Sequence, residues 1–370
     1  MTTVSPESER LYTAALLSIP KLGSRSIRAL VALFGSAKAV WDTPVSDLQE
    51  AIGLSHPAAQ SIQRCRPVYD WDKQLRGLQT HHVHLVSVWE DTYPAALQQT
   101  FNPPVILYYQ GQLPQTDRTV AMVGARKATP YGLNVSQTLA SDMARHGITV
   151  ISGGARGIDT KAHQGALAAK GTTLAVIANG LDIAYPKENK RLFAEIIDSG
   201  GAIISEYSFG IPPLSIHFPA RNRIIAGLCR CTVVIEAALR SGSLITADFA
   251  LEEGRDIFAV PGSIYSATSK GTHELIRKGA MILTQVEDIL QEYGWDQRKK
   301  APVSPQTYSP TLEEAAVLSA LSCEQALSRE DLIIKTKFTP SQLNPLLLQL
   351  QLQGLIEEIH HAFIKKGTLP

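Results

Sequence analysis

The sequence predicts an α/β fold built around a doubly wound, Rossmann-like parallel sheet, and two observations support this. Between residues 115 and 290, short apolar runs rich in β-branched residues alternate with stretches of helical pattern. Each run is apolar throughout, as in strands buried on both faces, and parallel strands need helical crossovers between them. The strand-like runs are TVAMVG, ITVIS, TLAVIA, AIIS, TVVIEA and DIFAVPG, and the helix-like stretches are 132–145, 161–169, 189–198, 222–228 and 246–253.

Two further runs, VHLVSV and PPVILYYQG, precede this alternation. We expect them to form short strands that extend or cover the sheet. Together these elements give an extended Rossmann-like domain over residues 77–290.

Residues 1–76 have a helical pattern that glycines interrupt at positions 23, 35 and 53. This pattern is similar to a pair of helix-hairpin-helix (SAM-like) units, whose glycine turns can present backbone N–H groups to DNA phosphates. A plain helical interaction domain fits the same pattern. Both interpretations stay open at this point.

The C-terminal part begins with a polar segment, residues 291–310, which holds three prolines and is expected to be a linker. Residues 311–370 then show helical stretches at 312–321, 329–336 and 340–354, followed by the two-stranded pattern LIEEI-HH-AFIKK. Three helices and a β-hairpin predict a winged helix. Its balanced charge does not favour strong duplex binding, so a protein-interaction role competes evenly with DNA binding.

Composition excludes several classes of protein. A chain of 370 residues with 44% hydrophobic residues is ordered and has more than one domain. With 35 Lys+Arg against 34 Asp+Glu, any nucleic-acid binding must come from a local patch. No run approaches the roughly 18 apolar residues of a membrane span, and the start, MTTVSPESER, lacks the pattern of a secretion signal, so we expect a cytoplasmic protein. The four cysteines form neither a disulfide framework nor a zinc-binding spacing; they are Cys65, Cys229, Cys231 and Cys323.

The loops that follow the predicted strands carry the functional signal, because ligands of doubly wound sheets bind at the carboxyl ends of the strands. Four of these loops combine cations with a following helix, whose free backbone N–H groups favour anions. In chain order they read GARKAT, SGGARGID, GLDIAYPKENKR and HFPARNR, and a fifth loop contains SGS. The second is typical of a phosphate cradle.

At one edge of the sheet, the cations of these loops would form a groove for a polyanion. They are Arg126, Lys127, Arg156, Lys187, Lys190, Arg191, Arg221 and Arg223. Hydroxyl groups and flexible backbone would complete the groove at Ser152, Gly153, Ser241, Gly242, Ser243 and Thr246.

Cofactor and metal sites are not expected. Neither glycine-rich loop reads G-x-G-x-x-G, no acidic residue ends the second strand, and no G-x-x-x-x-G-K-[ST] occurs. Asp159 and His163 stand four residues apart without a third ligand, which favours a helix-stabilising pair over a metal site. Glu206 and Glu236 could be paired carboxylates, but hydrogen-bonding roles near the loops are favoured because no nucleophile accompanies them.

The ordered motifs of the middle domain resemble the DNA-processing protein A family of bacteria, also called the Smf family. The matching strings are VGARKATPYG, SGGARGIDTKAH, GLDIAYPKENKRLF, FPARNRIIAGL, EAALRSGSLITADFALEEGRDIFAVPG and GTHELIRKGA, within residues 80–290. Two small departures are Ala125, where Thr is common, and Gly154, where Leu is common. Neither departure removes a charge or a required glycine.

The resemblance implies a non-enzymatic protein without cofactor that binds single-stranded DNA taken up in natural transformation, protects it, and helps to load a RecA-type recombinase. It also implies a homodimer formed through the Rossmann-like domain, with Ile264, Leu275 and Ile276 as apolar candidates, although core burial is favoured for at least two of them. Carried over by motif, Arg126, the Ser152–Gly153 loop, Lys187 or Lys190, Arg221 and Arg223 should line the groove. Phe193 should either stack on a base or pack in the core.

An enzyme that acts on nucleotides is the alternative function. Phosphoribohydrolases similar to lysine decarboxylases also bind a phosphate on a Rossmann-like sheet. They carry a P-G-G-x-G-T-x-x-E pattern with a catalytic Glu. Here the corresponding stretch, residues 241–248, reads SGSLITAD and lacks both the glycine pair and that Glu.

Overall fold

The computed structural model describes residues 5–114, 116–295, 310–321, 327–353, 355–359 and 362–365. The chain divides into two compact units, Met1–Asp296 and Gln297–Pro370, each of which is described by itself. Cys323, residues 296–309 of the expected linker and the expected hairpin turn at residues 360–361 lie outside the described residues.

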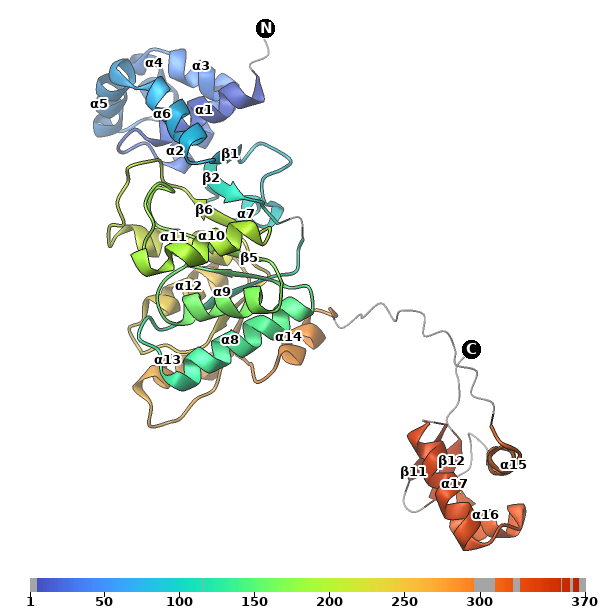
Figure 1. The fold of residues 1–370 in the computed structure, drawn as a ribbon. Helices are drawn as coiled ribbons and strands as arrows, with labels where there is room; N and C mark the ends of the chain where they lie inside the picture. Colours follow the sequence, from blue (N-terminus) through green and yellow to red (C-terminus); the bar gives the residue numbers. More distant parts are fainter. Residues whose placement is uncertain are drawn as a thin grey trace. The chain divides into compact units, whose positions relative to one another are not determined.

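Six helices form the N-terminal part of the first unit (Figure 1). They are α1 (Pro6–Leu17), α2 (Ser24–Phe34), α3 (Ala37–Asp42), α4 (Val45–Ile52), α5 (His56–Cys65) and α6 (Trp71–Thr80), with a 3-10 turn at Arg66–Val68. Gly35 and Gly53 end α2 and α4 in the left-handed conformation, at φ 85° and 61°, which glycine adopts without a steric penalty. The helical pattern predicted for this part is confirmed, whereas phosphate binding by its turns stays a prediction.

A nine-stranded mixed sheet forms the centre of this unit, in the order β1-β2-β6-β5-β4-β3-β7-β8-β9. The strands are β1 (His84–Ser87), β2 (Ile106–Gly111), β3 (Thr119–Val123), β4 (Thr149–Ser152), β5 (Thr173–Val176), β6 (Ala202–Ser205), β7 (Cys231–Val234), β8 (Asp256–Ala259) and β9 (Met281–Ile282). β2 is antiparallel to both of its neighbours, β1 and β6, and the strands from β6 onward in this order pair in parallel. β1 and β2 come from the runs VHLVSV and PPVILYYQG and extend the sheet, as predicted. The six predicted core strands are confirmed, and β9 adds an edge strand that the sequence pattern did not indicate.

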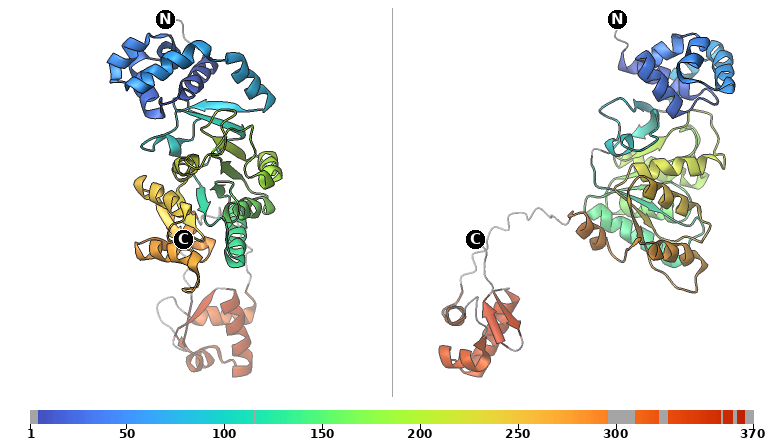
Figure 2. Two further views of the ribbon diagram at one scale, coloured as in Figure 1. Left: turned by 90° about the vertical axis from the view of Figure 1, so that its left-hand side faces the viewer. Right: turned by 180° about the vertical axis from the view of Figure 1, so that it is seen from behind.

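Helices cover both faces of the sheet, as views from opposite sides show (Figures 1 and 2). Alternate residues of a strand point to opposite faces, so Met122 of β3 lies in the core under α8 and α9, while Val123 lies in the core under α11 and α12. One face carries α8 (Pro130–Arg145), α9 (Ile158–Ala168), α10 (Lys190–Asp198) and α14 (Val286–Glu292). The other carries α11 (His217–Gly227), α12 (Gly242–Glu252) and α13 (Lys270–Arg277). Shorter helical turns are α7 (Ala95–Gln98), Lys187–Asn189 and Ala267–Ser269.

The strand order places a topological switch point at β3. From β3 the chain continues through α8 to β4 on one side, whereas β7 follows much later in the chain and lies on the other side. At such a point the loops after adjacent strands diverge, and a crevice opens between them at the carboxyl edge.

The C-terminal unit is a small three-helix domain with a short sheet. It contains α15 (Leu312–Ala320), α16 (Arg329–Thr336) and α17 (Pro340–Leu352), and a sheet of β10 (Leu327–Ser328), β12 (Ala362–Lys365) and β11 (Ile356–Ile359). Val317, Leu332, Leu343, Leu350 and Phe363 are buried in its own core. This arrangement confirms the predicted winged helix.

Candidate nucleic-acid site

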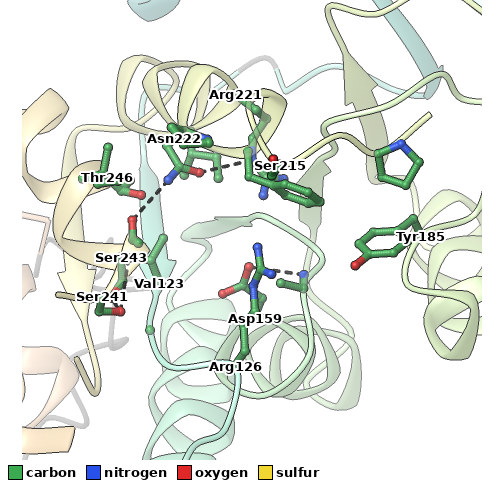
Figure 3. A pocket seen from close by; sticks show the side chains of 18 residues that line it. Val123, Arg126, Asp159, Tyr185, Ser215, Arg221, Asn222, Ser241, Ser243 and Thr246 are labelled. Carbon is green, nitrogen blue, oxygen red and sulfur yellow. Dashed lines mark hydrogen bonds between the residues drawn. The ribbon is translucent and has the colours of Figure 1, made fainter. Parts of the chain in front are cut away.

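A cavity of about 600 Å³ opens at the switch point, within the size range of ligand pockets (Figure 3). Its walls come from the loops after five strands: residues 123–126 after β3, 155–159 after β4, Tyr185 after β5, residues 213–225 after β6, and 241–246 after β7. The prediction that the functional loops meet at the carboxyl edge therefore holds for these five segments.

Arg126 is the exposed cation of this pocket, and its side chain reaches into it between Asp159 and the α11 wall (Figure 3). Its guanidinium carbon lies 4.8 Å from the centre of the Phe218 ring, a cation–π contact. Within the described residues no carboxylate forms an ion pair with Arg126 or with its exposed neighbour Lys127. The charge of Arg126 is therefore available to an anion in the pocket.

Arg221 lines the same pocket but is 4% exposed and already donates hydrogen bonds to backbone. Its Nη1 donates to the carbonyl oxygen of Gly153 at 2.7 Å, and also to that of Val176. Burial lowers the pKa of Arg221 to about 10, and the neighbouring Asp159 carboxylate opposes this change. Arg221 therefore remains charged at neutral pH and fixes the second loop in place.

Asp159 holds the same loop from the other side. Its Oδ2 accepts hydrogen bonds from the N–H groups of Gly153 (3.1 Å) and Ala155 (3.3 Å). Burial raises the pKa of Asp159 to about 6, while Arg221 and these hydrogen bonds act in the opposite direction. An anion placed against the second loop would face the buried Asp159 carboxylate, so the anion-binding side of the pocket lies toward Arg126.

The second loop differs from the predicted phosphate cradle. Ser152 is buried, and its hydroxyl donates to the carbonyl oxygen of Met122 at 2.6 Å. The Gly153 N–H is occupied by Asp159. In this structure, neither group is free to bind a phosphate. Gly157, at φ 78°, instead permits close approach of the first loop, because a Cβ there would lie 2.6 Å from the carbonyl oxygen of Arg126.

The wall opposite Arg126 is uncharged and rich in hydroxyl groups. Ser241 caps α12, since its Oγ accepts from the Ser243 N–H at 3.3 Å, and the two hydroxyls lie 2.7 Å apart. Asn222 of α11 donates to the carbonyl oxygen of Gly242 at 3.3 Å and so ties the two helices together. The predicted Ser241-Gly242-Ser243 segment therefore does lie at the pocket, at the start of α12, where the helix dipole favours an anion.

The remaining predicted cations lie at the same edge but outside this pocket. Arg156 forms an exposed ion pair with Glu188 at 2.9 Å and borders a smaller neighbouring cavity that also contacts Arg126. Lys187 is exposed in the 3-10 turn that precedes α10, and Lys190 is exposed at the start of α10; the described residues offer neither of them an ion-pair partner. The structure does not distinguish between these two lysines. Arg191 pairs with Glu195 on its own helix.

Two predicted residues lie elsewhere. Phe193 is 7% exposed and packs with Ala175, Leu192 and Ile203, which favours core packing over a stacking role. Arg223 forms an ion pair with Glu206 at 2.5 Å and donates to the carbonyl oxygen of Asn102. It points toward the N-terminal helices, because Glu206 also accepts a hydrogen bond from Ser24 of α2. Arg223 therefore does not join the pocket, contrary to the predicted common groove.

The other candidate constellations have structural roles. His163 shares a hydrogen bond with Thr173 and not with Asp159, so the predicted helix-stabilising pair of Asp159 and His163 is wrong. Burial lowers the pKa of His163 to about 3. Glu236 accepts hydrogen bonds from Thr129 and Thr268, as expected for a hydrogen-bonding role. In the described part of the chain, no group of three or more His, Cys, Asp or Glu residues could hold a metal ion. Cys65, Cys229 and Cys231 are free thiols. No helix among the described residues is long and apolar enough to cross a membrane.

Sequence reasoning missed Phe218, Tyr185 and Asp159 as parts of the pocket. The rings of Tyr185 and Phe218 lie 5.7 Å apart between centroids, and both line the cavity. Tyr185 stands in YPKENK and Phe218 in FPARNR, the two strings whose cations predict anion binding, so an aromatic residue beside these cations is the sequence signal for the two rings.

Comparison with known families and structures adds independent evidence. Residues 84–294 match the family described as DNA recombination-mediator protein A, and residues 300–360 match the DprA winged helix domain. The chain belongs to the DNA recombination-mediator protein A family. Among its relatives, the DNA processing protein DprA of Streptococcus pneumoniae is 47% identical over 208 residues, covering 56% of this chain and 73% of the relative. The protein Smf of Escherichia coli is 36% identical and covers 80% of each chain.

Two solved members of the family resemble this structure. The X-ray structure of DNA processing protein A from Streptococcus pneumoniae aligns with a TM-score of 0.65 at 36% identity, covering 77% of this chain and 97% of that one. A structure of the Helicobacter pylori protein, described in terms of its unique single-stranded DNA binding mode, aligns with a TM-score of 0.52 at 32% identity, covering 58% of this chain and 98% of that one. The family assignment and the Rossmann-like fold predicted from sequence are therefore confirmed.

Proposed function

We propose that this protein binds single-stranded DNA at the switch-point pocket, without sequence preference, and so protects the strand. The observation that carries the proposal is Arg126, an exposed cation without a carboxylate partner in the described residues, at the mouth of a nucleotide-sized pocket. Lys127, Lys187 and Lys190 extend the positive charge along the same edge. Binding of single-stranded DNA by the Helicobacter pylori relative supports this choice of ligand.

The chemistry of the pocket favours binding that is independent of sequence. Cations and a helix N-terminus contact phosphates, which are identical in every nucleotide, and the aromatic residues Tyr185 and Phe218 offer faces on which any base can stack. Phosphate contacts release counterions, so the affinity should fall steeply with salt concentration.

The wider role that we propose is to load a RecA-type recombinase onto DNA taken up in natural transformation, in the cytoplasm and as a homodimer. Membership of a family described as recombination mediators supports this role. Of the apolar dimer candidates, Leu275 is buried, Ile276 is partly buried and Ile264 is exposed. These observations leave Ile264 as the candidate with a free surface.

We further propose that the site binds and does not catalyse. Asp159, which lines the pocket, is buried against the second loop, and Glu236, which follows β7, accepts hydrogen bonds from Thr129 and Thr268. The alternative, hydrolysis of a nucleotide, would need a carboxylate that faces the sugar, and residues 241–248 supply no Glu.

Fluorescence anisotropy tests this proposal. A labelled single-stranded oligonucleotide is titrated with the protein over a salt series, with unlabelled single strands, the matching duplex and mononucleotides as competitors. Competition by single strands of any sequence, but not by mononucleotides, is the expected result. Displacement or turnover of mononucleotide, without binding of the strand, would favour the enzyme.

A further inference from the structure

Two loops next to the pocket expose large side chains, and only Ile264 among them has been considered so far, as a candidate for the dimer contact. Tyr131 at the start of α8 is 50% exposed, and Ile264 and Tyr265 in the loop after β8 are 73% and 92% exposed. None of the three lines the pocket. Large exposed rings that are grouped on one surface are typical of a binding site.

Hydrogen bonds hold these two loops together as one surface. The Tyr131 hydroxyl donates to the carbonyl oxygen of Pro261 at 2.9 Å. The buried Glu236 carboxylate joins the loops a second time, because it accepts from the Thr129 hydroxyl at 2.6 Å and from the Thr268 hydroxyl at 3.2 Å. These bonds hold the Tyr131 ring in place and keep the two loops together, while the Tyr265 ring extends from the second loop into solvent.

The chain connects this surface to the pocket over a short distance. Arg126 lines the pocket, and Tyr131 follows it by five residues at the start of α8, at most about 18 Å away along an extended chain. A strand held at Arg126 would reach Tyr131 within a few nucleotides, and Tyr265 stands four residues beyond Pro261, the hydrogen-bond partner of Tyr131.

The charge of the surface suits a nucleic acid. Residues 124–131 and 261–270 contain the exposed cations Arg126, Lys127 and Lys270 and no acidic residue. The nearby carboxylate, Glu236, is buried and already hydrogen-bonded. Rings interspersed with cations are the combination with which proteins bind single strands, since bases stack on the rings while phosphates contact the cations. A homodimer contact that covered both rings would bring two such positive surfaces together, which the repulsion between like charges opposes.

We propose that Tyr131 and Tyr265 form a base-stacking surface for the nucleotides that flank those held at the pocket. This inference rests on the proposed function, because it assumes that a single strand occupies the pocket. It assigns the bases outside the pocket to these two rings and predicts that the site extends toward β8.

An abasic scan tests the surface. Wild-type protein and the Tyr265→Ala variant are titrated against an oligothymidylate of about 12 nucleotides, within the ~4–16 nucleotides of known single-strand sites, and against versions with one abasic position each. Since the Tyr265 side chain is almost fully exposed, its removal leaves the fold intact. The matched control is Phe101→Ala, because Phe101 is 83% exposed and its N–H is bonded to Glu253, beyond the end of α12 that is remote from the pocket.

We expect Tyr265→Ala to bind the intact oligonucleotide about 5- to 150-fold more weakly, and Phe101→Ala to match wild type. Abasic positions that weaken binding to the wild-type protein should no longer weaken binding to Tyr265→Ala. Equal responses of wild type and Tyr265→Ala at every abasic position would overturn the inference while leaving the proposed function intact. A change of oligomeric mass in Tyr265→Ala with an unchanged abasic scan would overturn it in favour of a contact between copies. Failure of wild type to bind any strand would refute the proposed function itself.

Discussion

Replacing Arg126 with alanine should weaken single-strand binding and reduce its dependence on salt. The side chain is exposed, stacks on Phe218 at 4.8 Å and has no carboxylate partner among the described residues, so its charge is free to meet a phosphate. By contrast, Arg156 and Arg223 are paired with Glu188 and Glu206. Arg126→Ala should therefore have a larger effect than Arg156→Ala.

The size of the affinity loss and the change in salt slope follow from two known quantities. A hydrogen bond to a charged group contributes about 1.5–3 kcal/mol, which corresponds to roughly 10- to 150-fold in Kd at low salt. Each phosphate contact on a single strand contributes about 0.7 to the slope of log affinity against log salt. Because one contact is lost, the ratio of the Kd of the variant to the Kd of wild type should fall by about 2.6-fold between 50 and 200 mM salt.

Anisotropy titrations of Arg126→Ala across this salt range measure both quantities. Arg145→Ala is the matched control, since Arg145 is an exposed arginine that pairs with Asp142 at the opposite end of α8, about 20 Å or more away along the helix. Arg126→Lys keeps the charge but loses the planar contact with Phe218, so its salt slope should match wild type while its affinity is intermediate. Identical Kd values and slopes for Arg126→Ala and wild type would refute the placement of a phosphate at Arg126.

Three other outcomes follow from the contacts. The Asp159 carboxyl, whose pKa is raised from 3.8 to about 6, destabilises the fold as pH rises between these two values, by about 1.36 kcal/mol per pH unit. In urea denaturation, the free energy of unfolding of Asp159→Asn should therefore rise by up to about 3 kcal/mol relative to wild type between about pH 4 and 6.5. A difference that stays constant over this range would contradict the raised pKa. Arg223→Ala removes the ion-pair partner of Glu206, so it should lower the free energy of unfolding by about 1–3 kcal/mol and leave the salt slope of DNA binding unchanged. Adding Glu206→Gln to this variant should restore part of the stability. A lowered salt slope would place Arg223 on the DNA. Phe193→Leu should lower thermal stability but leave single-strand affinity near wild type, whereas loss of affinity at unchanged stability would restore the stacking role.

The sequence predicted the sheet well because its strands are buried on both faces. Runs such as TVAMVG and TVVIEA are apolar at every position, and β3 and β7 lie side by side in the centre of the sheet. β9 escaped prediction because Met281 and Ile282 form a two-residue edge strand, too short for any periodic signal. The loops at the carboxyl edge followed from strand order alone, since parallel strands bring those loops together.

The direction of each side chain could not be predicted. Arg221 and Arg223 are two residues apart on α11, and the turn of the helix directs one into the pocket and the other toward Glu206 and the N-terminal helices. Ser152 was expected to bind phosphate because it precedes a glycine-rich loop, but its strand position directs the hydroxyl to Met122. These outcomes depend on partners that are distant in the chain, which local patterns do not contain.

Hydrogen–deuterium exchange of the full chain, with and without a saturating single-stranded oligonucleotide, tests most directly whether the switch-point pocket holds the strand. We predict slower exchange in the loops that line it, at residues 124–129, 153–159, 213–222 and 241–246, and in the flanking loop 261–269. Slower exchange confined to the N-terminal helices or to the C-terminal unit, with these loops unchanged, would contradict the account and move the DNA site elsewhere.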